Sequence, residues 1–162
     1  MSGSRILPHF VGALILALAV YAGAFWLDKH LRTRRGPWEV TFDRMADGTP
    51  AISIRQQQLG IREVRIQFPG ETTATEPASI RFDAPGLAVP WGRLKYDDLT
   101  YLPGVVTLEL FGHEIELLPR TLYLNRRAIA WNLATNLTLR ASDRPAALPE
   151  PSPRKSGGLG PK

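Results

Sequence analysis

The sequence contains no cysteine among its 162 residues. This absence excludes a disulfide framework, a thiolate metal site, an iron–sulfur cluster and a cysteine nucleophile. Histidine is also scarce. His9 lies in a long apolar stretch and His30 in the basic segment that follows it, so only His113 is available as an imidazole base in the remainder of the chain.

The common catalytic motifs are absent as well. The chain has no G-x-S-x-G nucleophile elbow, no H-E-x-x-H zinc motif, no P-loop and no G-x-G-x-x-G dinucleotide fingerprint. We therefore expect a protein that is not an enzyme and that has no cofactor and no metal. An enzyme that uses only carboxylates stays open as an alternative, because such sites leave little trace in a sequence.

The positive net charge of +5 does not extend over the whole chain. Between Trp38 and Asp143 there are 11 Lys and Arg against 13 Asp and Glu, so this part is slightly acidic. A nucleic-acid-binding domain carries its basic patch on the folded surface. We therefore expect no nucleic-acid partner.

An uncharged apolar run extends from Ile6 to Leu27. As a helix its 22 residues are about 33 Å long, which is enough to cross the hydrocarbon core of a bilayer. A cleaved signal peptide is the main alternative, since Ala22-Gly23-Ala24 matches a cleavage site. The run continues past that site and exceeds the usual length of a signal peptide's apolar core, which favours an uncleaved anchor.

Cations flank the apolar run on its C-terminal side. They are Lys29, Arg32, Arg34 and Arg35. The N-terminal side has only Arg5 and the α-amine, so the positive-inside rule favours a cytoplasmic position for the rest of the chain. An exported position is not excluded, and membrane lipid is an expected partner in either case.

The segment from residue 38 to residue 143 has the pattern of a mainly β domain. Short runs of alternating polarity are separated by turn signals such as Asp47-Gly48 and Pro103-Gly104. The predicted strands are Glu39–Phe42, Ala51–Arg55, Glu63–Phe68, Ser79–Phe82, Val105–Phe111, Glu114–Leu118, Thr121–Leu124 and an interrupted Ile129–Leu139. This pattern predicts a small antiparallel β-sandwich or barrel-like domain behind one N-terminal transmembrane helix.

The predicted organisation has four parts. Residues 1–28 form the membrane anchor, or a signal peptide in the alternative, and 29–37 a basic juxtamembrane linker. Residues 38–143 form the β domain. Residues 144–162, which are rich in proline and glycine, form a basic tail that is expected to be disordered.

One hairpin carries the candidate interaction surface. If Gly112 and His113 form a two-residue turn, Leu110 faces Ile115 and Glu109 faces Glu116. The candidate residues are Glu109, His113, Glu114 and Glu116. They could bind a divalent cation or a basic partner, but pairing of the glutamates with nearby arginines is the more ordinary interpretation.

Two other groups have ordinary interpretations beside functional ones. Trp38, Trp91 and Trp131 could form an aromatic surface for a ligand, although tryptophans in small β domains more often fill the core. Asp97 and Asp98 could serve acid–base chemistry, but neighbouring side chains on a strand diverge, so a solvated loop is favoured.

These observations predict a single-pass membrane-anchored β domain with a non-catalytic binding or accessory role at a membrane surface. Its expected partners are membrane lipid and another membrane protein. The alternatives are an exported module that binds a ligand in an aromatic groove, and a membrane-tethered enzyme that depends on carboxylates.

Overall fold

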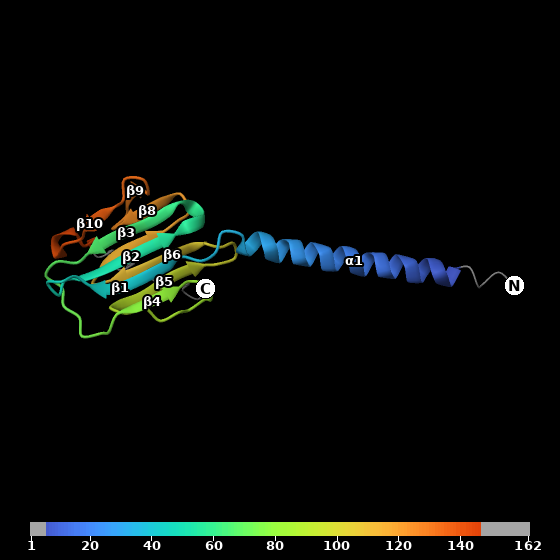
Figure 1. Ribbon diagram of the computed structural model, residues 1–162, viewed down its shortest axis with the longest axis horizontal. Coiled ribbons are helices and arrows are strands. Elements are labelled where there is room, and N and C mark those ends of the chain that lie inside the picture. Colours follow the sequence, from blue (N-terminus) through green and yellow to red (C-terminus); the bar gives the residue numbers. More distant parts are fainter. Residues whose placement is uncertain (1–5, 147–162) are drawn as a thin grey trace, which may run out of the picture.

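The computed structural model describes residues 6–146, and of residues 6 and 7 only the backbone. It begins with one long helix, α1 (Ile6–Thr33), which projects from one end of a β domain (Figure 1). The predicted tail from residue 147 onward lies outside the described residues. Its first residues, 144–146, follow a short 3-10 turn, η2 (Ala141–Asp143).

The helix α1 is long and apolar enough to span a membrane, and it is not covered by the domain. Phe10, Leu18 and Trp26 are 69%, 58% and 69% exposed. The helix continues to Thr33, so it includes the first five residues of the segment predicted as a linker.

The β domain is a sandwich of two five-stranded sheets. A small β-sandwich was one of the two architectures that the sequence pattern predicted. Sheet A has the strand order β10-β3-β2-β1-β4 and consists of β1 (Glu39–Arg44), β2 (Pro50–Gln56), β3 (Ile61–Gln67), β4 (Ala78–Arg81) and β10 (Asn136–Thr138). Sheet B has the order β5-β6-β7-β8-β9 and consists of β5 (Gly92–Asp98), β6 (Val105–Leu110), β7 (His113–Leu117), β8 (Thr121–Leu124) and β9 (Arg127–Ala130). All pairs are antiparallel except that of β10 with β3.

The core lies between the two sheets, where the inward side chains of alternating strands meet. In β1, Val40 and Phe42 are fully buried while Glu39 and Thr41 remain partly exposed. The largest fully buried side chains are Trp38, Phe42, Phe68 and Phe82. In β1, alternation of polarity therefore indicated correctly which face is buried.

Strand β5 was missed by the sequence analysis, which interpreted Asp97 and Asp98 as a loop. The strand has few apolar residues because it lies at an edge of sheet B and most of its residues are exposed. Its pairing with β6 begins at Gly92, opposite Leu110. A Cβ at Gly92 would lie 1.9 Å from the Glu109 carbonyl oxygen, so the close approach of the two strands requires glycine here.

The predicted register of the β6–β7 hairpin was wrong. The two-residue turn consists of Phe111 and Gly112, whose φ angles of 50° and 79° are those of a type I′ turn. His113 therefore belongs to strand β7, opposite Leu110, and Glu109 faces Glu114 instead of Glu116. The shift keeps the buried face unchanged, so hydrophobic alternation did not distinguish the two registers.

Candidate functional site

The corrected register places the four hairpin residues on opposite faces of sheet B. Glu109, Glu114 and Glu116 are on the outer face, whereas His113 points into the core and is 0% exposed. The four side chains therefore do not form one cluster. Within residues 6–146, no three His, Asp or Glu side chains are close enough together to hold a metal ion.

Two of the three glutamates are paired with cations from the edge strand β5. Arg93 lies 2.9 Å from Glu109, and Lys95 lies 2.7 Å from Glu114. Lys95 also holds the pKa of the Glu114 carboxyl below its usual value. The expected neutralisation of the hairpin is thus present, but its cations come from the strand that sequence analysis missed.

Glu116 differs from its neighbours. Burial raises its pKa, and the nearby Glu114 carboxylate raises it further. Within the described part of the chain no ion pair involves Glu116. It lies in a cross-strand row with Thr107 and Tyr123 as its direct neighbours and Tyr96 beyond Thr107.

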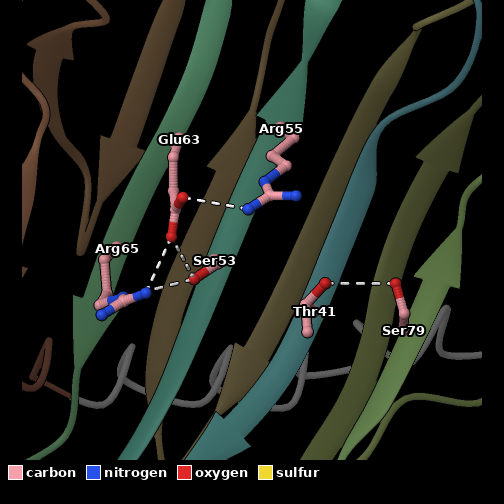
Figure 2. A network of polar contacts seen from close by, with 6 residues as sticks. All are labelled: Thr41, Ser53, Arg55, Glu63, Arg65 and Ser79. Carbon is pink, nitrogen blue, oxygen red and sulfur yellow. Dashed lines mark hydrogen bonds and ion pairs between the residues drawn. The ribbon is translucent and has the colours of Figure 1, made fainter.

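On the outer face of sheet A, a glutamate is paired with two cations, in contrast to Glu116. Figure 2 shows Glu63 between Arg55 and Arg65, at 3.1 Å and 2.9 Å, with Ser53 donating a further hydrogen bond. Arg55 and then Arg65 lower the pKa of Glu63. This glutamate is therefore neutralised by two arginines within its own sheet.

The side chain of Asn125 holds the buried His113 in place by a hydrogen bond. Asn125 donates a hydrogen bond from Nδ2 to His113 Nδ1 at 3.0 Å, and Asn125 Oδ1 accepts one from the Glu114 backbone N–H. Asn125 Nδ2 also donates to the Asp143 carbonyl, which ties η2 to the β7–β8 strand pair. Arg144, the residue after η2, forms a separate ion pair with Glu71, which follows β3 in the chain.

His113 is expected to make the domain less stable in mild acid. Burial, and then the charge of Arg144, lower the pKa of His113 below its usual value. The unfolded chain therefore takes up a proton at a pH where the folded protein does not, and stability falls as the pH drops below about 6.5. Denaturant titrations of the full chain at neutral and mildly acidic pH should show this loss.

A His113→Gln variant should remove most of that pH dependence, even if it is less stable at every pH. A matched His30→Gln variant, in which an exposed helix residue changes, should retain it. An identical pH slope in the two variants would contradict the assignment.

The three tryptophans act mainly as core residues. Trp38 is 0% exposed, and its Nε1 donates to the Gly104 carbonyl at 3.1 Å. Trp131 packs on Trp38 with ring centroids 5.3 Å apart, and Trp91 packs edge-on against Phe42 at 5.2 Å. Trp91 and Trp131 are half-buried in these contacts, so the three rings do not form one exposed aromatic surface.

Asp97 and Asp98 stabilise turns. Asp97 accepts a hydrogen bond from the Gly86 backbone N–H at 2.9 Å, and Asp98 accepts one from the Thr100 N–H at 3.1 Å. The bond from Thr100 lowers the pKa of Asp98. The two carboxylates therefore have separate partners.

The membrane-flank cations lie where α1 meets the domain. The Leu102 backbone N–H donates to the Arg32 carbonyl at 2.6 Å, and the Arg32 guanidinium lies 5.5 Å from the centre of the Tyr101 ring. Lys29 is on the same part of the helix, while Arg34 and Arg35 follow its end. Sequence analysis identified these cations but not the loop that they contact, because that loop is distant in the sequence.

A groove of about 450 Å³ separates the end of α1 from the β domain. One wall is the helix face formed by Phe25, Asp28, Lys29, Arg32 and Thr33, and the other is formed by Asp83, Leu99, Thr100 and Leu102. A second hollow of about 460 Å³ lies beside β9 and β10, near the last described residues. Only the first hollow combines charges of both signs with the end of the apolar helix.

Comparison with models of known protein families, with curated proteins and with solved structures found no match to this chain.

Proposed function

We propose that this protein is a membrane-anchored binding module without catalytic activity, whose β domain is held beside the bilayer by α1. The observation that carries this proposal is the exposure of the apolar helix. Its side chains from Phe10 to Leu27 are all exposed to solvent. Burial of that surface in lipid is the natural way to remove it from water.

A binding role accords with the positions of Asp97 and Asp98, whose carboxylates accept hydrogen bonds from backbone N–H groups. The adjacent pair that an enzyme would have used, Asp97 and Asp98, is engaged in two separate turns. Anchoring confines the domain to the membrane plane and so raises its effective concentration toward partners there. The cations after the apolar run favour a cytoplasmic domain.

We propose that the contact surface is a sheet face and not a sheet edge. Strands β4, β9 and β10 have only four, four and three residues. The remaining edge strand, β5, has a register shift beside Lys95. Short, bulged and lysine-bearing edges disfavour the addition of a partner strand.

The outer face of sheet B is suited to a basic partner. Glu116 offers a carboxylate outside the ion pairs described above, and Tyr123 lies opposite it on β8. A lysine or arginine side chain placed here would meet a carboxylate and an aromatic ring together.

Membrane attachment is tested by flotation and extraction of the full chain. The protein should float with vesicles and should resist extraction by high salt and by alkaline carbonate, and detergent should release it. Protease protection of a C-terminal tag in intact cells then tests on which side of the membrane the β domain lies. A full-length protein that stays soluble without detergent would overturn the proposal.

The contact face is tested with a lysine- and arginine-rich peptide as the probe. Glu116→Gln should weaken binding of this probe by about tenfold, as expected for the loss of a charged contact. The matched control is Glu63→Gln, which removes a carboxylate already paired within sheet A. Equal effects of the two substitutions would show that only net charge matters and would remove sheet B as the contact surface.

A further inference from the structure

The groove between α1 and the β domain lies at the boundary of the apolar helix. Its helical wall comprises Phe25, Asp28, Lys29, Arg32 and Thr33. These positions are spaced by three, one, three and one residues, so they form a single helix face. Phe25 is still within the apolar run, and Lys29 lies one turn further on.

This position corresponds to the headgroup layer if α1 spans the membrane, as the proposed function requires. From Leu27 to Thr33 the helix rises about 9 Å, and the headgroup region on one side of a bilayer is about 5–7 Å thick. Tyr101, which is 58% exposed, lies beside Arg32 on the opposing loop. Tyrosine is favoured at this depth because its ring is apolar and its hydroxyl is polar.

The charges in the groove are divided between its two walls. Asp28 and Arg32 form an ion pair with each other at 2.7 Å on the helix. In the described part of the chain, no ion pair or side-chain hydrogen bond involves the Lys29 ammonium or the Asp83 carboxylate. Lys29 is on the helix wall and Asp83 is on the domain wall. Among the residues that the structure describes, the groove is therefore lined by an unpaired cation and an unpaired anion on opposite walls.

We infer that this groove binds the headgroup of a zwitterionic phospholipid that carries a primary ammonium group, as phosphatidylethanolamine does. Lys29 contacts the phosphate, Asp83 accepts hydrogen bonds from the ammonium group, and Phe25 contacts the start of an acyl chain. The two unpaired charges are complementary to those of such a headgroup, since the cation Lys29 would meet the anionic phosphate and the anion Asp83 the cationic ammonium. The groove also includes Phe25, which belongs to the apolar run.

The same arrangement predicts discrimination between lipid classes. Phosphatidylcholine has a quaternary ammonium that cannot donate a hydrogen bond to Asp83. Phosphatidylglycerol has the phosphate but no cation, so the Asp83 carboxylate would face a net negative charge. Of these three headgroups, ethanolamine is the one whose phosphate and primary ammonium can contact both Lys29 and Asp83.

The test uses the full chain reconstituted in nanodiscs of phosphatidylcholine with equal minor amounts of phosphatidylethanolamine and phosphatidylglycerol. After gentle extraction, mass spectrometry identifies the lipids that remain with the protein. Phosphatidylethanolamine should be enriched about fivefold over its input ratio, the effect of roughly one surface charge contact. Lys29→Gln and Asp83→Asn should each remove most of this enrichment.

Matched controls separate the groove from general charge effects. Arg34→Gln removes an equal charge from the same flank outside the groove, and Asp43→Asn removes a carboxylate on β1 outside the groove. Both controls should keep the enrichment. Lys29 and Asp83 are exposed, so the two test variants should keep the fold, which circular dichroism checks.

Three outcomes would overturn the inference while leaving the anchor in place: no lipid enriched on an incorporated protein, preference for phosphatidylglycerol, or enrichment that survives Lys29→Gln and Asp83→Asn. A chain that fails to enter nanodiscs would overturn both the proposed function and this inference.

Discussion

The double substitution Leu14→Arg with Leu18→Arg is expected to transfer the protein from the membrane fraction to the soluble fraction. Both leucines are near the middle of the apolar run and are 61% and 58% exposed. An arginine near the centre of a spanning helix costs about 2.5–3.5 kcal/mol, so two cost about 6 kcal/mol. This changes the membrane partition by a factor of about 10⁴.

The control for this prediction is Leu14→Ala with Leu18→Ala, which shortens the same side chains without adding charge and should leave the protein in the membrane. The β domain should stay folded in both variants, because α1 touches it only at the helix end. Retention of the arginine variant in carbonate-washed membranes would contradict anchoring by α1.

Replacement of Trp38 by alanine is expected to lower the free energy of unfolding of the β domain by about 3–5 kcal/mol. The side chain is 0% exposed, packs on Trp131 and donates to the Gly104 carbonyl. The substitution removes this packing, leaves a cavity and takes away the partner of that carbonyl. Denaturant titration of the full chain in detergent, followed by far-ultraviolet circular dichroism, measures the loss.

Two further variants separate the hydrogen bond of Trp38 from its packing, and a core tryptophan from an exposed one. Trp38→Phe keeps most of the apolar ring but removes the N–H donor, so it should cost less than the alanine substitution. Trp26→Ala removes a tryptophan that is 69% exposed on α1 and should leave the domain's stability nearly unchanged. Equal losses from Trp38→Ala and Trp26→Ala would contradict the assignment of Trp38 to the core.

The corrections to the predicted fold have a common cause. The β5 strand has the sequence Gly-Arg-Leu-Lys-Tyr-Asp-Asp, whose charges are possible because an edge strand has one partner and much solvent contact. The wrong register of the β6–β7 hairpin kept the buried apolar residues of both strands on the buried side. Apolar pattern alone therefore missed a strand that buries little and could not choose between registers that bury the same face.

The sequence by itself determined the apolar helix, the cations that follow it and the mainly β character of the remainder, because each depends on composition or on local periodicity. Only the tertiary structure decided which charges are neutralised. It places Arg93 and Lys95 beside Glu109 and Glu114 but provides Glu116 with no cation among the described ion pairs. It also brings Asp83 across the groove from Lys29. These relations depend on strand order and chain crossing, since residues distant in sequence meet only when the sheets pack.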